Sequence, residues 1–311
     1  MFCDISKAFD RVWHDGLIHK LRRSGISANL LHWLGDYLRL TDRQQLVVLS
    51  NLQSYTVPIL PGVPQGSILG PLLFLVYIND IVLDIDSSIR LFADDYALYV
   101  IVENPANAAA QLNKGLDTIH TWAEHWLVSF NPFKTESLFV WRKSDKLVHP
   151  PIFMNSVRIE EVQSHKHLCV LFTNSCSWHD HIQEIKKKGW KRLHIRRSLK
   201  FILDRKLLET IYTSFIRPIL EYADVVFDNM TTSDNDDLKS IQAEGARIIT
   251  GATRLVSLQN LYRETGLEPL QERRRKHNTS FFTKCILPCV LLISLLLFQH
   301  SLQSSKRRRY S

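Results

Sequence analysis

The order of apolar and polar positions predicts interleaved strands and helices over the first 178 residues. Short runs with the apolar, β-branched and aromatic composition of strands lie at residues 2–5, 45–49, 55–60, 89–92, 97–102 and 137–141. Helical patterns follow the turn at residues 7–13, the capping residue Ser27, residue 68 and the pair Asn104–Pro105. One-sided helices between strands predict an α+β layer architecture.

From about residue 180 the pattern becomes helical. We predict helices at residues 182–203, at 205–222 and from an acidic turn at 233–237 to about residue 250. Residues 286–298 then form an apolar run of thirteen positions, shorter than the roughly 20 that a membrane span needs. We therefore expect no membrane association and interpret the tail as a degenerate end, with a membrane anchor over residues 281–300 as the second interpretation.

Charge is distributed unevenly along a chain whose apolar share of 45% and charged share of 23% are those of a globular protein. Residues 1–178 carry fifteen basic and seventeen acidic side chains, whereas residues 186–206 carry ten basic side chains and one acid, Asp204. An acidic part followed by a basic helix favours a cation-dependent site beside a polyanion. The five cysteines have no C-x-x-C spacing, which argues against a zinc site and a disulfide framework and favours an intracellular compartment.

Three aspartates are the candidate chemical centre. Asp94 and Asp95 lie at the tip of the hairpin predicted at residues 89–102. A turn alone would explain one aspartate, but two adjacent like charges become favourable when they share a divalent cation. Asp4 follows the first predicted strand, and if this strand lies beside the hairpin, Asp4 and Asp94 converge. Such carboxylates can hold two ions about 4 Å apart, and Mg²⁺ suits a site completed by water and phosphate.

Three segments carry a resemblance to a known family. Residues 2–10, 62–71 and 92–95 occur in this order and resemble palm motifs A, B and C of the reverse transcriptases of non-LTR, LINE-type, jockey-like retrotransposons. Residues 131–136 resemble motif D, and His167–Leu168 with residues 178–182 resembles motif E and its exit. The segments 241–270 and 273–277 resemble the region after the thumb, so that the resemblance covers roughly residues 1–280.

The resemblance implies a right-hand polymerase palm at residues 1–178, with an antiparallel sheet covered by helices on one face. It also implies a helical thumb and post-thumb region at 179–276 and a degenerate tail at 277–311. The chain would be a fragment that starts at motif A, without the fingers or an upstream endonuclease. It would extend a DNA 3′-hydroxyl on an RNA template with dNTPs, by two-metal nucleotidyl transfer with Mg²⁺, or Mn²⁺ as an alternative. No obligate protein partner is expected, and the location would be the nucleus or the cytoplasm. The alternative is a catalytically inactive, nucleic-acid-binding remnant.

The resemblance also implies a role for individual residues. Asp4, Asp94 and Asp95 would be the catalytic, metal-binding carboxylates, with the Ile5 carbonyl as an extra ligand. Phe9 would lie against the sugar and exclude a 2′-hydroxyl, Gln65 and Gly66 would contact the incoming nucleotide, and Lys134 would protonate the pyrophosphate. Phosphate contacts in the thumb would come from the basic side chains Lys186, Lys187, Lys188, Lys191, Arg192, Arg196 and Arg197. Cys169 stands in the motif E turn where the family usually has glycine, which matters if the turn needs a positive φ.

Overall fold

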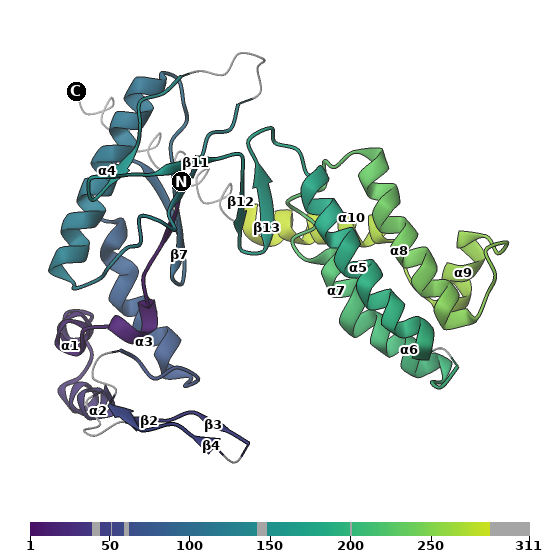
Figure 1. Cartoon of the computed structure of the whole chain (residues 1–311), viewed down its shortest axis with the longest axis horizontal. Helices are drawn as coiled ribbons and strands as arrows, with labels where there is room; N and C mark the ends of the chain where they lie inside the picture. The colour runs from purple at the N-terminus through teal and green to yellow at the C-terminus, as the bar shows by residue number, and fades with distance from the viewer. Residues whose placement is uncertain (39–43, 51, 59–61, 142–147, 200, 287–311) are drawn as a thin grey trace, which may run out of the picture. The chain divides into compact units, whose positions relative to one another are not determined.

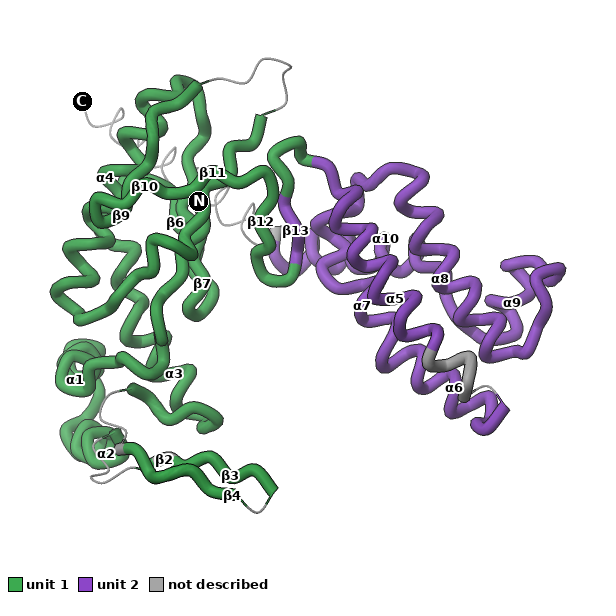
Figure 2. The backbone as a smooth tube through the Cα atoms, in the orientation of Figure 1, with its two compact units in different colours: residues 1–169, 173–176 green, residues 170–172, 177–311 purple. Residues whose placement is uncertain are grey.

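The structure is a computed structural model that describes residues 1–38, 44–50, 52–58, 62–141, 148–199 and 201–286. The chain divides into two compact units, which Figures 1 and 2 show. Unit 1 comprises residues 1–169 and 173–176. Unit 2 comprises residues 170–172 and 177 onwards.

The centre of unit 1 is a five-stranded sheet with the order β11-β8-β1-β7-β6. Its strands are β1 (Phe2–Asp4), β6 (Ser88–Phe92), β7 (Asp95–Tyr99), β8 (Glu136–Leu138) and β11 (Glu160–Val162). The pairings are antiparallel except for β8 with β11, which is parallel. The parallel pair departs from the predicted antiparallel sheet, and it is possible because more than twenty residues connect the two strands.

Helices cover one face of this sheet (Figure 1). The helices of unit 1 are α1 (His14–Arg23), α2 (Ala28–Leu38), α3 (Leu69–Ile78) and α4 (Pro105–His125), with 3₁₀ turns η1 (Ala8–Arg11) and η2 (Asn79–Val82). Cys3, Tyr96 and Leu98 of the sheet share one buried core with Phe74 of α3 and Ile119 of α4. The α+β fold predicted from the sequence is therefore confirmed.

Several local predictions for unit 1 are also confirmed. The Asn104 side chain accepts a hydrogen bond from the backbone N–H of Ala106 at 2.9 Å and so caps α4. The strands predicted at residues 45–49 and 55–60 belong to a ribbon in which β2 (Gln44–Gln45) pairs with β5 (Val57–Pro58) and β3 (Val48–Leu49) with β4 (Leu52–Gln53). The smaller pair β9 (Phe153–Met154) and β10 (Val157–Arg158) was not predicted.

Unit 2 is helical in its described part beyond residue 176. Its elements are α5 (His179–Leu199), α6 (Arg205–Ile211), the π-helix η3 (Tyr212–Ile216), α7 (Arg217–Glu221), α8 (Thr232–Thr250), α9 (Leu258–Thr265), α10 (Leu270–Phe281) and the π-helix η4 (Phe282–Ile286). The single helix predicted at residues 205–222 is interrupted by a π-helical segment that ends at Ile216, two residues before Pro218. Proline lacks the N–H that an α-helix would use.

A second difference concerns the acidic residues 233–237, which are the first turns of α8 and not a turn before it. Thr231 caps this helix by accepting a hydrogen bond from the Asp234 N–H at 3.2 Å. Carboxylates are favourable beside the unpaired N–H groups at a helix N-terminus. The acidic cluster is therefore a start signal of the helix.

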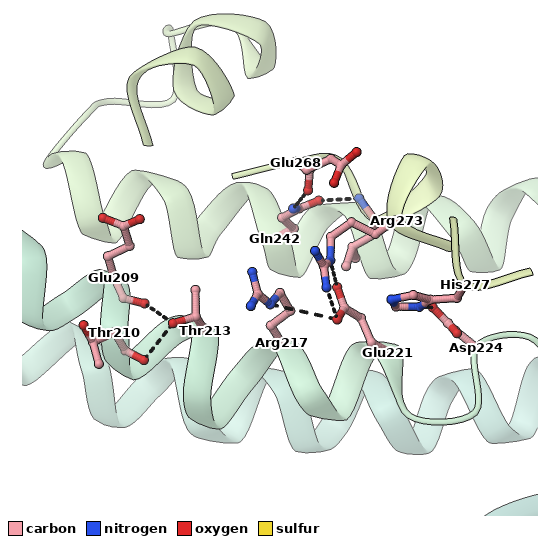
Figure 3. Close-up of polar contacts among 11 residues, drawn as sticks. Glu209, Thr210, Thr213, Arg217, Glu221, Asp224, Gln242, Glu268, Arg273 and His277 are labelled. Carbon is pink, nitrogen blue, oxygen red and sulfur yellow. Dashed lines mark hydrogen bonds and ion pairs between the residues drawn. The ribbon is translucent and has the colours of Figure 1, made fainter. Parts of the chain in front are cut away.

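Polar side chains attach α10 to the other helices of unit 2 (Figure 3). Arg273 of α10 makes a two-pronged ion pair with Glu221 of α7, with Nη2 3.0 Å from Oε2. His277 lies 2.8 Å from the Asp224 carboxylate. The buried Gln242 side chain of α8 donates to the Glu268 carbonyl oxygen at 2.8 Å. These contacts fix the start of α10 beside α7 and α8.

The apolar run predicted at residues 286–298 and the basic residues 306–309 lie, except for Ile286, outside the described residues. None of the helices within the described ranges is long and apolar enough to cross a membrane.

Candidate active site

Two of the three predicted carboxylates face each other across neighbouring strands. β1 pairs with β7 in the register Phe2 to Ala97, Cys3 to Tyr96 and Asp4 to Asp95. Directly opposed residues of antiparallel strands point to the same face of a sheet. Cys3 and Tyr96 are buried on the helix-covered face, so Asp4 and Asp95 lie on the opposite face.

Asp94 lies in the two-residue turn between β6 and β7. Phe92 and Asp95 close this turn as the last ladder pair, and Ala93 has a φ of 53°. The predicted convergence of Asp94 with Asp4 stays a prediction. The register puts Asp95, and not Asp94, directly opposite Asp4.

The segment after α4 approaches Asp4 from the other side of β1. The Asn131 N–H donates to the Asp4 carbonyl oxygen at 3.0 Å, and the Ser6 N–H donates to the Ser129 carbonyl at 2.8 Å. These two bonds flank the isolated bridge between Ile5 and Phe130. Because peptide groups alternate sides along a strand, the Ile5 carbonyl points away from Phe130 and toward the β7 side.

Lys134 lies beside the same carboxylate. A tight turn, in which the Lys134 N–H donates to the Asn131 carbonyl at 3.1 Å, brings the side chain back toward β1. Its Nζ lies 3.7 Å from Asp4 Oδ2, and the Lys134 side chain is 68% exposed. The structure thus brings a solvated ammonium group to the carboxylate site.

The loop that resembles motif B packs on the η1 turn. The Val63 N–H donates to the Phe9 carbonyl at 2.8 Å. Gly62 has a φ of 96°, and a Cβ there would lie 2.6 Å from the same carbonyl oxygen, so only glycine permits this approach. Gly66 also has a positive φ, 80°. Gln65 is exposed, and its Nε2 donates to Asp10 Oδ1 at 2.7 Å.

Phe9 is half-buried and packs against Phe74 of α3, with ring centroids 4.6 Å apart. Phe74 belongs to the core. One side of the Phe9 ring is therefore fixed by the core. Its predicted contact with the sugar stays a prediction.

Two histidines that the sequence reasoning gave no role lie on the aspartate face of the sheet. β12 (Ser164–His167) places the His165 ring in a stack on Phe2, with centroids 3.9 Å apart, and the His167 ring 5.0 Å from Phe2. Burial holds the pKa of His167 below its ordinary value, while Asp95 acts in the opposite direction. His165 and His167 are two positions apart in a strand, and this spacing is the sequence signal that could have placed both on one face.

The motif E turn has the backbone that glycine would favour. Leu168 and Cys169 connect β12 to β13 (Val170–Thr173), with φ values of 47° and 64°. Two consecutive positive φ values are those of a type I′ hairpin turn. Cys169 therefore occupies a left-handed position without the freedom of glycine.

The predicted basic residues all belong to α5 of unit 2 but differ in their surroundings. Lys186 lies 2.8 Å from Asp237, Lys188 lies 3.7 Å from Glu184, and Arg192 donates to the Phe215 carbonyl. Lys187 and Lys191 are exposed and have no acidic partner among the described residues. The structure does not describe the side chains of Arg196 and Arg197.

The donor set on the sheet face fits a hard divalent cation only in part. Carboxylate and carbonyl oxygens are the ligands that Mg²⁺ prefers, and Mg²⁺ keeps several positions for water and phosphate. Within the described residues, however, no three His, Cys, Asp or Glu side chains are grouped closely enough to hold a metal ion by themselves. The described side chains alone therefore do not form a complete metal site.

Comparison with known proteins gives the family of the chain. Residues 1–183 match the family "Reverse transcriptase (RNA-dependent DNA polymerase)". The chain is 28% identical to a probable RNA-directed DNA polymerase from transposon BS of Drosophila melanogaster, over 100% of this chain and 35% of that protein. It is 28% identical to the RNA-directed DNA polymerase from the mobile element jockey of the same species, over 88% of this chain and 30% of that protein.

A third relative is the probable RNA-directed DNA polymerase from the Drosophila melanogaster transposon X-element, 29% identical over 90% of this chain and 31% of that protein. The chain thus spans about a third of the length of these curated relatives. The family match covers more than half of the 311 residues and includes all three aspartates. The chain therefore belongs to the reverse transcriptase (RNA-dependent DNA polymerase) family, and its resemblance to the jockey-like, non-LTR members is confirmed.

Proposed function

We propose that this chain is the palm and thumb portion of an RNA-directed DNA polymerase that extends a DNA 3′-hydroxyl on an RNA template with dNTPs. The observation that supports this most directly is the pairing of Asp4 with Asp95 on the open face of the sheet. Family membership supplies the reaction class. The RNA template, the DNA primer and the dNTPs are proposed on the same ground.

Asp4, Asp94 and Asp95 would hold two Mg²⁺ ions, with the Ile5 carbonyl as a further ligand. When bound, such ions acidify the primer hydroxyl and neutralise the triphosphate. Asp4 and Asp95 supply negative charge at directly paired positions of adjacent strands, and phosphate and water oxygens would complete the shell of such ions. Lys134, at 3.7 Å from Asp4, donates a proton to the leaving pyrophosphate.

The motif B loop and η1 form the nucleotide-binding side of this site. Gln65 contacts the incoming nucleotide, and the positive φ of Gly66 lets the backbone approach the new base pair. Phe9, supported from behind by Phe74, excludes a ribose 2′-hydroxyl by its size. The site therefore selects deoxynucleotides.

Unit 2 is the proposed thumb. We assign the palm to residues 1–178 and the thumb and post-thumb region to 179–276. The tail expected at 277–311 begins inside α10, whose His277 still contacts Asp224 of unit 2. Lys187 and Lys191 are one helical turn apart on α5, exposed and without acidic partners in the described part of the chain. They are the best candidates for contacts to the nucleic-acid backbone, and the site of action would be the nucleus or the cytoplasm.

Primer extension tests the proposal. The full chain, with an RNA template, a DNA primer, dNTPs and Mg²⁺, should extend the primer, whereas Asp4→Asn should not. Asp117→Asn, on the exposed face of α4, is the matched control and should extend like the parent. Salt-sensitive binding to an RNA–DNA duplex without extension by any variant would contradict the polymerase and indicate a binding-only remnant.

The phosphate contacts have a separate test. The logarithm of the duplex affinity falls with the logarithm of the salt concentration in proportion to the number of phosphates neutralised. Replacing Lys187 and Lys191 by alanine should make this slope shallower by about 2. Replacing Lys114, an exposed lysine of unit 1 that pairs with Asp86, should leave the slope unchanged.

A further inference from the structure

The Gln65 side chain is held by a residue with no assigned role. Its Nε2 donates to Asp10 Oδ1 at 2.7 Å, across 55 positions of the chain. Asp10 lies in η1, directly after Phe9, and Gln65 lies in the loop before α3. Both residues are exposed, so this bond is not needed to satisfy a buried group.

The backbones that carry the two side chains are fixed against each other. The Val63 N–H donates to the Phe9 carbonyl at 2.8 Å, and the Gly62 N–H donates to the Val12 carbonyl at 3.1 Å. His14 Nε2 lies 2.7 Å from the Gly62 carbonyl oxygen. These contacts lie on both sides of Asp10 in the chain. The geometry between Asp10 and Gln65 is therefore built into the fold and does not depend on two free side chains meeting.

The chemistry of the pair fixes the orientation of the amide. An ionised carboxylate can only accept hydrogen bonds, so the Gln65 end that faces Asp10 must be the NH₂ group. The carbonyl oxygen Oε1 is then turned away from Asp10 and can accept a hydrogen bond from a ligand. A hydrogen bond to a charged group is also stronger than one between neutral groups. A glutamine without this partner would sample both amide orientations.

We infer that Asp10 is a positioning residue that orients the Gln65 amide for the incoming nucleotide. This inference rests on the proposed function, because it assumes that Gln65 contacts that nucleotide. Asp10 acts only through Gln65 and touches neither the nucleotide nor the metal-binding carboxylates. The same short segment thus supplies a core-backed ring at Phe9 and an anchor for the motif B glutamine at Asp10.

The geometry can be tested without any activity. The side-chain NH₂ signals of Gln65 in a ¹⁵N-labelled full chain are identified by their loss in Gln65→Ala. In Asp10→Ala they should move toward solvent-exposed values and exchange faster with water. Asp10→Asn should change them less, because asparagine Oδ1 can still accept from Nε2. Unchanged signals in Asp10→Ala would overturn the inference.

The consequence for the nucleotide is tested by binding. The probe is a complementary dNTP, added to the chain on an RNA template with a DNA primer that ends in a dideoxynucleotide, so that no reaction occurs. Asp10→Ala should weaken dNTP binding about tenfold, as expected for one charge-assisted hydrogen bond. Gln65→Ala should weaken it as much, and the double variant no further, because the two residues act as one unit.

Further measurements distinguish a failure of this inference from a failure of the proposed function. Primer–template affinity without dNTP should stay within roughly twofold in all variants, and Asp117→Ala should behave like the parent throughout. Additive losses in the double variant, or normal dNTP binding by Asp10→Ala, would overturn the inference and leave the polymerase proposal intact. If the parent chain binds no dNTP, the proposed function fails and the nucleotide role of Asp10 fails with it, whatever the NH₂ signals show.

Discussion

The ammonium group of Lys134 lies 3.7 Å from a carboxylate oxygen of Asp4, although 130 positions separate the two residues. The contact depends on the pairing of the Asn131 N–H with the Asp4 carbonyl, which brings the following turn beside β1. Because 68% of the Lys134 side chain is exposed, this ion pair adds little to the stability of the folded protein. The contact therefore matters more for the charge of the site than for the fold.

Replacing Lys134 by methionine should slow nucleotide addition about 100-fold, the usual effect of removing a general acid. Binding of the primer–template should not change, because the other side chains of the site remain. Single-turnover extension measures the rate, and Lys134→Arg should recover part of it by restoring the charge. Lys114→Met, which removes another exposed lysine paired with an aspartate, is the control. A rate equal to that of the parent would remove Lys134 from the mechanism.

Asp95 should be as sensitive as Asp4. The two residues are direct partners in the ladder between β1 and β7, whereas Asp94 lies in the adjacent turn. Asp95→Asn should reduce extension about 100-fold or more, because it removes fixed charge from the site. Extension in a series of Mg²⁺ concentrations measures this. If Asp95→Asn keeps clearly more activity than Asp94→Asn, the turn residue is the principal ligand and the register is a poor guide.

The sequence predicted those features that depend on local periodicity or on motif order. The strand before Asp4, the hairpin around Asp94 and Asp95 and the cap at Asn104 each leave a signal within a few residues. Features set by distant partners left no such signal. The parallel pairing of β11 with β8 and the bond from Gln65 to Asp10 join segments that are more than twenty positions apart. Neither could be placed until the chain was folded.

The two differences in unit 2 concern the residues that start or interrupt a helix. The pattern at residues 205–222 predicts one helix that contains Pro218. Because proline has no N–H to donate, the α-helical hydrogen bonding changes here, and a π-helical segment precedes α7. The acidic residues before Leu238 were interpreted as a turn, although carboxylates also favour the first turn of a helix. In both cases the residue type fits two local structures, and packing against the neighbouring helices decides between them.

Cys169 offers a test of backbone strain. It has a φ of 64° in the two-residue turn between β12 and β13. A non-glycine residue in this conformation destabilises the folded state by about 1–2 kcal/mol. Glycine removes this strain, but it also increases the conformational entropy of the unfolded chain, which offsets part of the gain. Cys169→Gly should therefore raise the free energy of unfolding by about 1 kcal/mol, measured by urea denaturation. Ser164→Gly, within β12, should lower it; equal effects at the two positions would exclude strain at Cys169.

The pair between α5 and α8 should make the stability of the protein depend on pH. Asp237 accepts hydrogen bonds from Lys186 at 2.8 Å and Gln183 at 2.9 Å. The bond from Lys186, followed by that from Gln183, holds the pKa of Asp237 below its ordinary value. As the pH falls, the unfolded chain therefore takes up this proton first. The contribution of Asp237 to stability is complete above about pH 5, where the group is ionised in both states. It is lost as the pH falls through the lowered pKa of the folded state.

Asp237→Asn should accordingly be less stable than the parent chain by a constant amount between pH 7 and about pH 5. Below the ordinary aspartate pKa of about 3.9, this difference should shrink, because the parent loses its charged pair while the variant has none to lose. Urea denaturation at a series of pH values measures both curves. Asp236→Asn is the matched control, since the neighbouring carboxylate makes only an exposed pair with Lys239. A difference at pH 3 as large as that at pH 7 would mean that Asp237 stabilises the helices by its shape and not by its charge.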